Sequence, residues 1–316
     1  MINIIFFGTP LIALKSLEYL FNSENINVLA VVTQPDKPAG RGHKLTMSPI
    51  KVFALEHNLP IFQPKSIRKE PDVIEELKKL NPDFFVTFAF GQILSQEVLD
   101  IPEYETINLH ASLLPKYRGA NPIQRVLIDG EEETGICTMI TELGVDCGDI
   151  CKKQIIKISE NMNCENLYEE ISDDAPELIE TTLIGMYEHK LCPIPQFEDG
   201  ICIAPKVTKE ETKIDWSKSA KQIHNLIRGI YKSPSAYFVY DNKIIKVLET
   251  RTAEYRQPME FYKNYELGSI VGTTKDGIEV LTGDGILKIL VVKPEGKGEM
   301  QATAWHNGIR NRKVHQ

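Results

Sequence analysis

The feature that most constrains the fold is the alternation of short apolar runs with helix-like segments through the first half of the chain. Apolar residues dominate residues 2–8 (INIIFFG), 26–32 (INVLAVV) and 83–90 (DFFVTFAF), and 105–111 (ETINLHA) is a further strand-like run. Between them, apolar residues recur at helical spacing. This alternation predicts an α/β fold, a doubly wound Rossmann-like domain with a mostly parallel sheet. Ligands of such sheets bind outside the carboxyl ends of the strands.

One expected helix has a clear start signal. Residues 48–59 read SPIKVFALEHNL, with Ser48 suited to be the N-cap and Pro49 the first helical residue. Further helices are expected over residues 9–23, 71–82 and 95–100.

The pattern changes near residue 205, where a proline and a charged run interrupt the chain. Short strand-like runs follow, separated by the turn signals Asp241-Asn242, Asp276-Gly277 and Asp284-Gly285. Several short strands within about 90 residues favour a small β-barrel of the oligonucleotide-binding (OB-like) type. We therefore expect a catalytic domain over residues 1–204 and a smaller OB-like domain over 205–316.

Charge is distributed unevenly over the 316 residues, although the net charge of −8 alone would argue against a polyanionic partner. Residues 1–205 hold 17 Lys and Arg against 31 Asp and Glu, whereas residues 206–316 hold 19 against 13. A basic second part suggests that it holds a polyanion such as nucleic acid. A chance drift toward basic residues would leave the same bias.

Other bulk features indicate the compartment. No run of about 18 apolar residues is present that would cross a membrane. The apolar N-terminus lacks a basic flank and a small-residue cleavage site, so it reads as a strand and not as a signal peptide. Six cysteines show neither CxxC pairs nor zinc-like spacing, which is typical of free thiols in a reducing cytoplasm. We expect a cytoplasmic monomer without a bound metal.

Two polar residues stand at the end of the run 105–111. Asn108 and His110 are two apart, so in a strand their side chains project to the same side. An Asn amide can donate to a developing oxyanion, and an imidazole can carry a proton near neutral pH. An isolated pair of this kind is more often a satisfied polar pair at a strand end.

Two further segments favour a catalytic interpretation. Residues 112–115 (SLLP) form an apolar loop suited to line a flat ring. The loop ELGVDCGDI supplies Asp146 and Asp149, either of which could orient His110. Spacing alone does not choose between the two aspartates.

Residues 34–45 (QPDKPAGRGHKL) combine prolines, glycines and four potentially basic side chains. Such a composition usually marks a mobile surface loop. It also suits a flexible basic arm that orders against phosphates or unstacked bases. The first strand-like run ends in FFGTP without a GxGxxG pattern, which argues against a dinucleotide site.

Taken together, these motifs resemble those of methionyl-tRNA formyltransferases over nearly the whole chain. The resemblance rests on IIFFGTP, VVTQPDKPAGRGHKL, FAFGQILSQEVL, INLHASLLPKYRGANPIQ, LGVDCGDI and VTKEETKIDWSKSA. N-x-H-x-S-L-L-P-x-x-R-G followed by G-x-D-x-G-D marks the wider group of formyltetrahydrofolate-dependent formyltransferases. The PAGRG loop and the second domain point to the tRNA-specific members.

The resemblance implies transfer of a formyl group from 10-formyltetrahydrofolate to the α-amino group of methionine on initiator tRNA. It implies that Asn108 stabilises the oxyanion, that His110 donates and carries a proton, and that Asp146 holds His110. Asp149 is then structural. Folate contacts are implied for Phe88, Phe90, Gly91, Ile93, Ser112, Leu113, Leu114 and Pro115. Contacts with tRNA are implied for Lys37, Arg41, Lys44, Lys206 and Lys209.

Three other functions fit parts of the sequence. A formyltransferase for a small amine, such as a nucleotide-linked amino sugar, would use the same residues but would not need the basic loop or the basic second domain. A folate-dependent hydrolase would use water as the nucleophile. A non-catalytic RNA-binding protein would not need Asn108, His110 and Asp146 together.

Overall fold

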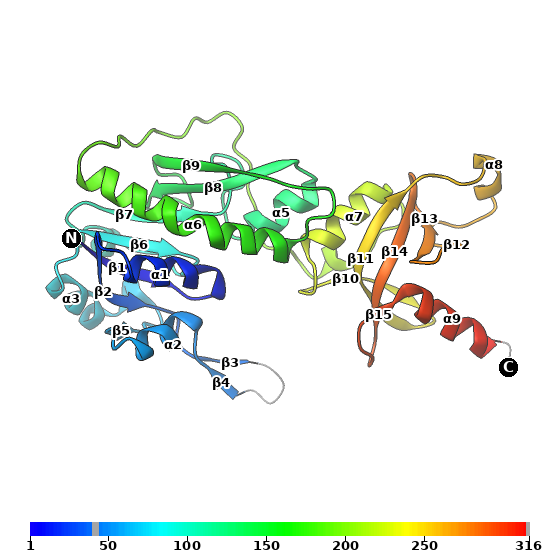
Figure 1. Ribbon diagram of the computed structural model, residues 1–316, viewed down its shortest axis with the longest axis horizontal. Helices are drawn as coiled ribbons and strands as arrows, with labels where there is room; N and C mark the ends of the chain where they lie inside the picture. Colours follow the sequence, from blue (N-terminus) through cyan, green and yellow to red (C-terminus); the bar gives the residue numbers. More distant parts are fainter. Residues whose placement is uncertain (40–43, 314–316) are drawn as a thin grey trace. The chain divides into compact units, whose positions relative to one another are not determined.

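The computed structural model describes residues 1–39 and 44–313 (Figure 1). The chain divides into two compact units. The first comprises Met1–Gly119, Glu133–Lys157 and Tyr168–Ala204, and the second comprises Ala120–Glu132, Ile158–Leu167 and Pro205–Gln316.

The first unit is built on a seven-stranded sheet with the order β5-β2-β1-β6-β7-β8-β9. Strands β5, β2, β1, β6 and β7 are parallel, and at one edge β8 runs antiparallel to both of its neighbours, β7 and β9. The predicted α/β class with a mostly parallel sheet is confirmed. The strands are β1 (Ile2–Gly8), β2 (Ile26–Val32), β5 (Ile61–Phe62), β6 (Phe84–Phe88), β7 (Glu105–His110), β8 (Glu133–Ile140) and β9 (Ile150–Lys157).

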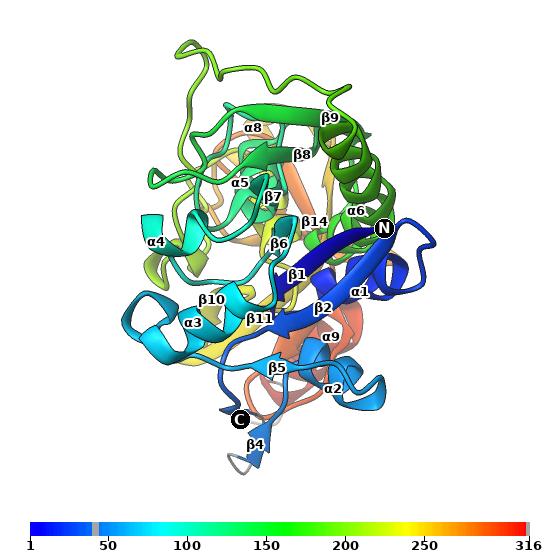
Figure 2. The same cartoon turned by 90° about the vertical axis from the view of Figure 1, so that its left-hand side faces the viewer.

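Helices cover both faces of this sheet. Figure 2 shows α1 and α6 on one face and α3 and α4 on the other. The 24-residue α6 was not predicted from the sequence, because acidic pairs and an internal proline, Pro176, interrupt its apolar positions. The helical elements are η1 (Leu11–Ala13), α1 (Leu14–Phe21), α2 (Pro49–Glu56), η2 (Ile67–Lys69), α3 (Pro71–Lys79), α4 (Gln96–Leu99) and α6 (Cys164–Tyr187).

The start signal of α2 works as its sequence predicts. The Ser48 side chain accepts a hydrogen bond from the backbone N–H of Lys51 at 3.1 Å, and Pro49 is the first helical residue. This contact satisfies one of the amides that every helix leaves unpaired at its N-terminus.

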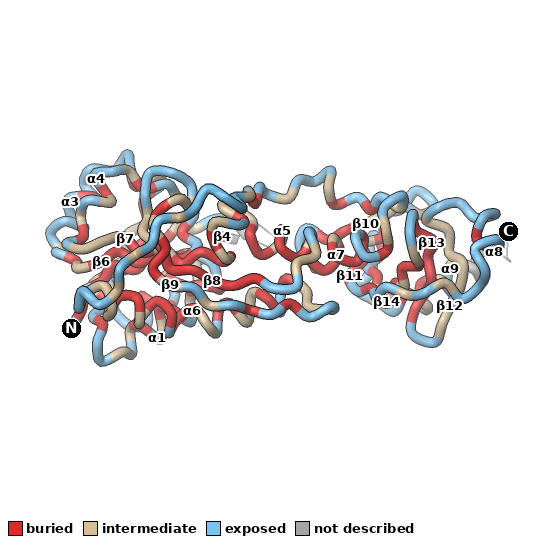
Figure 3. The backbone as a smooth tube through the Cα atoms, turned by 90° about the horizontal axis from the view of Figure 1, so that it is seen from above, coloured by how far each residue is buried: buried red, intermediate tan, exposed pale blue. Residues whose placement is uncertain are grey.

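Burial is concentrated in the central strands, as the red segments of Figure 3 show. Strand β1 is buried on both faces, because helices cover both, and this explains its continuous apolar sequence. Ile5 and Phe7 face α3 and α4, packing with Ile74 and Val98 among others.

The second unit contains an antiparallel sheet of order β10-β11-β14-β13-β12, with β15 paired to β14. Helix α7 begins with a capping box in which Ser219 and Gln222 satisfy each other's backbone amides. The elements are α5 (Pro122–Asp129), η3 (Glu210–Thr212), α7 (Ala220–Gly229), β10 (Ala236–Tyr240), β11 (Lys243–Ala253), α8 (Met259–Tyr262), β12 (Ile270–Thr273), β13 (Ile278–Leu281), β14 (Ile286–Pro294), β15 (Met300–Gln301) and α9 (Ala302–Lys313). The predicted small β domain is confirmed.

The turn signals of the second unit fall between paired strands. Asp241 and Asn242, with φ of 50° and 55°, join β10 to β11 as a two-residue hairpin turn. Both residue types tolerate this left-handed conformation, which the twist of a hairpin favours. Asp276-Gly277 and Asp284-Gly285 likewise connect antiparallel neighbours.

An ion pair anchors the start of the C-terminal segment within the second unit. Arg125 on α5 makes a bidentate contact with Glu211, with Nη1–Oε1 at 2.6 Å and Nη2–Oε2 at 3.0 Å. Its guanidinium also donates to the carbonyl oxygens of Pro205 and Lys206. The hydrogen bonds from Arg125 lower the pKa of Glu211 from 4.5 to about 2.

We expect Glu211→Gln to lower the thermal midpoint at pH 7, and this difference from wild type to shrink as the pH falls from about 4.5 toward about 2. A lowered folded-state pKa means that the ionised form stabilises the fold above the unfolded pKa and stops doing so as the carboxylate becomes protonated. Calorimetric scans across this pH range test the prediction. Glu210→Gln removes the same charge from an exposed neighbour and is the control; a pH-independent difference for Glu211→Gln would contradict the assignment.

Candidate active site

The candidate residues lie at the carboxyl ends of β1, β6 and β7. Gly8 pairs with Phe88 across β1 and β6, and Thr87 pairs with Asn108 across β6 and β7. The chain passes from β1 to β2 on one side and to β6 on the other, so the strand order reverses here. In open α/β sheets this reversal is the usual ligand position.

Asn108 is held by its neighbour in the sheet. Its Oδ1 accepts a hydrogen bond from the Thr87 hydroxyl at 2.7 Å. This contact turns the amide so that the Nδ2 hydrogens face away from the hydroxyl. Asn108 is partly exposed, so its amide nitrogen is the group that the residue offers to a ligand.

His110 is buried, with 6% of its surface exposed. Its Nε2 lies 2.9 Å from the carbonyl oxygen of Tyr117. Because a carbonyl can only accept, Nε2 carries a hydrogen and Nδ1 of the neutral ring has a lone pair. Nδ1 faces Oδ2 of Asp146 at 3.6 Å, which is too long for a direct hydrogen bond.

Of the two aspartates that the sequence leaves open, the structure places Asp146 beside His110. Asp146 Oδ2 also accepts the backbone N–H of Gly119 at 2.8 Å. Asp149 instead contributes its backbone carbonyl to the N–H of Ile140 at the end of β8. The site therefore presents two proton acceptors, Nδ1 and a carboxylate, that face each other.

Two glycines allow the chain to reach this geometry. Gly119 has a φ of 120°, which side-chain-bearing residues rarely adopt. A Cβ on Gly148 would lie 2.1 Å from the carbonyl oxygen of Ile140. The Asp146 loop can therefore fold back onto β8 only with glycine at position 148.

The residues expected to contact folate divide into two groups by exposure. Phe88, Phe90, Ser112 and Leu114 are buried, with Phe90 packed edge-on against Phe7 at 5.3 Å between ring centroids. They support the loops from inside. Ile93 is 65% exposed, and the residues that present surface are Gly91, Ile93, Leu113 and Pro115.

The loop after β7 is fixed by polar contacts of its own. The Ser112 hydroxyl donates to the carbonyl of Lys116 at 2.6 Å, and Lys153 Nζ donates to the carbonyl of Leu114 at 2.5 Å. This support leaves the partly exposed side chains of Leu113 and Pro115 in defined positions.

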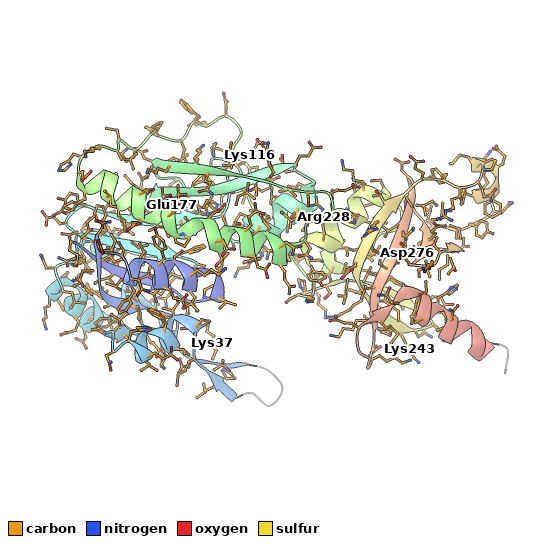
Figure 4. All side chains as sticks on the ribbon, in the orientation of Figure 1. Lys37, Lys116, Glu177, Arg228, Lys243 and Asp276 are labelled. Atoms are coloured by element: carbon orange, nitrogen blue, oxygen red, sulfur yellow. The ribbon has the colours of Figure 1, made fainter. Side chains whose placement is uncertain are left out.

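The basic arm begins as a short hairpin of β3 (Lys37–Ala39) and β4 (Lys44–Thr46). Lys37 is exposed on β3 (Figure 4), and Arg41 lies outside the described residues. At the base, Lys51 and Gln63 bind Asp36 at 2.6 and 2.9 Å, and the hydrogen bond from Lys51 lowers the pKa of Asp36.

The side chain of Lys44, a further expected tRNA contact, lies outside the described residues. Lys206 and Lys209, the last two expected contacts, are exposed in the second unit. Their neighbourhood is held by the Arg125–Glu211 pair, since Arg125 donates to the Lys206 carbonyl at 3.1 Å. Both ammonium groups are therefore attached to an anchored segment of chain.

Three residues without a predicted role support the candidate catalytic groups, one by direct contact with Asp146 and two through intermediate residues. Gln196 donates to the Asp146 carbonyl, Arg118 holds Gln196, and Cys202 accepts the N–H of Tyr117. Gln196 lies 50 residues after Asp146, in a segment with no recognisable motif. Only the family pattern around the R-G dipeptide pointed to Arg118.

Within the described part of the chain, no helix is long and apolar enough to span a bilayer. The same residues contain no group of three or more His, Cys, Asp and Glu placed to hold a metal ion.

Comparison with known proteins first defines the class. Residues 2–183 match the model of the formyl transferase domain, and residues 206–310 match that of the formyl transferase C-terminal domain. Residues 184–205, which include Gln196 and Cys202, lie between the two matched stretches.

Solved structures of low sequence identity share the fold. An N-formyltransferase from Helicobacter canadensis, in complex with folinic acid and dTDP-3-aminofucose, has a TM-score of 0.66 at 19% identity, over 93% of this chain and 100% of that one.

A second fold relative is HypX from Aquifex aeolicus in complex with tetrahydrofolic acid. It has a TM-score of 0.63 at 16% identity, and the match covers 95% of this chain and 46% of the HypX chain.

Sequence relatives then define the particular family. A methionyl-tRNA formyltransferase of Clostridium perfringens is 47% identical over 287 residues, 91% of this chain and 90% of the relative. One from Caldanaerobacter subterraneus is 42% identical over 298 residues, 94% of each chain. This chain belongs to the family of methionyl-tRNA formyltransferases.

Proposed function

We propose that this protein transfers the formyl group of 10-formyltetrahydrofolate to the α-amino group of methionine esterified to initiator tRNA. The observation that carries the proposal is the grouping of Asn108, His110 and Asp146 at the end of β7, in a chain of this family. The product, formylmethionyl-tRNA, starts protein synthesis. The cytoplasm is the compartment where both substrates meet, and we propose that the enzyme acts there as a monomer.

The reaction begins when the neutral amine attacks the formyl carbon, which becomes tetrahedral with a negative charge on oxygen. The Asn108 amide donates to this oxyanion through Nδ2. One such donor contributes about 3–4 kcal/mol in the transition state. The Thr87 hydroxyl holds the amide in the donating orientation beforehand, so little reorganisation is needed.

The attacking nitrogen must then lose a proton. His110 Nδ1 accepts it, because Nε2 already carries a hydrogen that Tyr117 binds. The resulting imidazolium is stabilised by the adjacent Asp146 carboxylate. Protonated Nδ1 is then the second donor of the site, and it passes the proton to the leaving nitrogen of tetrahydrofolate as the tetrahedral intermediate collapses.

The two substrates fit different parts of the molecule. For the folate, the surface is offered by Ile93, Leu113, Pro115 and the backbone at Gly91, which combine apolar area with amides able to bind a heterocycle edge. For the tRNA, cations are offered by the arm and by Lys206 and Lys209. We propose that residues 1–204 carry formyl transfer and that residues 205–316 bind tRNA; in the structure, residues 120–132 and 158–167 belong to the second unit.

The test incubates the purified protein with 10-formyltetrahydrofolate and charged initiator tRNA and measures formylmethionyl-tRNA. The absence of formylmethionyl-tRNA among the products would overturn the proposal. A nucleotide-linked amino sugar as acceptor tests the alternative of a small amine, and formate released without any acceptor would indicate a hydrolase.

We expect Arg41→Ala to raise KM for initiator methionyl-tRNA by about 10-fold, since one contact of a guanidinium with phosphate or base is worth about 1–3 kcal/mol. The KM for the folate should stay unchanged. Steady-state kinetics with each substrate varied in turn measure both values. Arg68→Ala, which removes the same charge from the same unit outside the arm, is the control. Equal KM values for the two variants would contradict a role for the arm.

A further inference from the structure

The extended segment 192–204, which we call the strap, follows α6 and runs along the first unit beside β9 (Figure 1). Ile194 exchanges two backbone hydrogen bonds with Ile150 of β9, at 2.8 and 2.9 Å. Further along, the Cys202 carbonyl accepts the N–H of Arg118 and the Ala204 N–H donates to the Arg118 carbonyl. The strap is therefore fastened at both ends.

Gln196 occupies the middle of the strap, and its amide is fully used. Oε1 accepts from Nε and Nη2 of Arg118 at 3.0 and 2.7 Å. Nε2 donates to the carbonyl oxygens of Asp146 and Gly148 at 3.0 and 2.7 Å. A guanidinium only donates and a carbonyl only accepts. Only one of the two possible orientations of the Gln196 amide therefore satisfies all four hydrogen bonds. Gln196 thereby connects Arg118 to the backbone of the Asp146 loop.

The Asp146 loop needs such a connection because its backbone conformation is unfavourable. Asp146 has a φ of 49°, in the left-handed region, which aspartate tolerates better than most side-chain-bearing residues but which the surrounding contacts must still hold in place. Its neighbours Leu143 and Val145 are 62% and 67% exposed, so apolar packing does not hold them in place. The restraint on the loop comes largely from the hydrogen bonds of Gln196 and of the Gly119 N–H.

The strap also restrains His110, the residue that faces Asp146, through Tyr117. Cys202 Sγ accepts the N–H of Tyr117 at 3.1 Å, and the Tyr117 carbonyl in turn binds His110 Nε2. Arg118, which follows Tyr117 directly, is gripped by the strap on both its backbone and its side chain. The same segment thus restrains both the imidazole and the carboxylate.

We propose that Gln196 is a positioning residue for formyl transfer. It ties the backbone of the Asp146 loop to Arg118, so that the Asp146 carboxylate faces His110 Nδ1. This inference rests on the proposed function. Because a misplacement of about 1 Å can cost about 100-fold in rate, loss of the Gln196 amide should affect turnover more than substrate binding.

The first experiment compares Gln196→Met with wild type. Methionine keeps the length of the side chain but loses all four hydrogen bonds. We expect kcat to fall about 30- to 100-fold while both KM values change by less than about 3-fold. Gln154→Met is the matched control in the same unit, because Gln154 hydrogen-bonds Asp174 on α6 and has no part in the Asp146 loop. Its kcat should remain near that of wild type.

A double-mutant cycle separates positioning from general stability. In an Asp146→Asn background, where the charge that Gln196 positions is gone, Gln196→Met should lower the residual kcat by no more than about 3-fold. A purely structural residue would lower kcat by the same factor in both backgrounds.

Gln196→Glu keeps the interaction with Arg118 but points a carboxylate at two carbonyl oxygens. It should preserve the thermal midpoint and still lower kcat at least 30-fold, so the inference stays testable if the methionine variant does not fold. Equal kcat losses in the two backgrounds, or a near-normal kcat for Gln196→Glu, would overturn the inference. A wild-type protein that forms no formylmethionyl-tRNA would instead overturn the proposed function.

Discussion

Replacing Asn108 by alanine is expected to lower kcat for formyl transfer by about 10²- to 10³-fold, with KM for either substrate changed by less than about 3-fold. In the proposed mechanism, the amide donates to an oxygen that becomes fully charged only in the tetrahedral intermediate. Its loss therefore raises the barrier without weakening the ground-state complex. Single-turnover measurements with saturating 10-formyltetrahydrofolate and initiator methionyl-tRNA give the rate of the chemical step directly.

Asn27→Ala is a suitable control, because it removes an asparagine of the same sheet that hydrogen-bonds Asn3 at 2.9 Å, away from the carboxyl ends of the strands. Asn108→Asp adds a second test, since it keeps the size of the side chain but cannot donate. A kcat near wild type for either Asn108 variant would show that another group stabilises the oxyanion.

Asp146→Asn is the second change with a large expected effect, a fall in kcat of about 10²- to 10³-fold, within the range attributed to general acid–base catalysis. The asparagine still offers an oxygen to the Gly119 N–H, so the loop keeps one of its contacts. It lacks the negative charge that, in the proposed mechanism, stabilises His110 when Nδ1 carries a proton. The effect should therefore appear in kcat and persist when both substrates are saturating.

The neighbouring Asp149→Asn is the natural comparison for this variant. Asp149 contributes its backbone carbonyl to β8, which the substitution leaves intact, so we expect kcat to stay within about 3-fold of wild type. If Asp149→Asn instead lost as much activity as Asp146→Asn, the assignment of Asp146 as the partner of His110 would be wrong.

Much of the fold was predictable from local patterns. The buried strands β1, β2 and β6 are continuous apolar runs because helices cover both faces of the sheet, and α2 starts at its Ser48 cap. Helix α6 escaped prediction because Pro176 and acidic pairs break its apolar stripe. It is stabilised by tertiary contacts, such as the Ser172 hydroxyl donating to the Ile12 carbonyl, that no local pattern displays.

The part of the candidate site that lies on strand β7 was predictable, because residue spacing in a strand determines which side chains share a side. Two-residue spacing in a strand predicts Asn108 and His110 on one side, and both residues do lie in a strand, β7. The choice of Asp146 depended on a left-handed turn, and the tautomer of His110 on a carbonyl seven residues away. Gln196 was beyond reach, because its role arises from contacts 50 and 78 residues distant in the chain.

The position of the strap has a consequence for how the enzyme becomes active during its synthesis. A nascent chain that has emerged as far as residue 187 carries all the strands of the seven-stranded sheet and helix α6. It also carries Asn108, His110 and Asp146. It does not yet carry Gln196 or Cys202. Domains fold largely as units from the N-terminus, so the sheet can form before the loop of Asp146 is restrained. On the proposed role of Gln196, catalytic competence is reached only when residues 192–204 have joined the folded sheet.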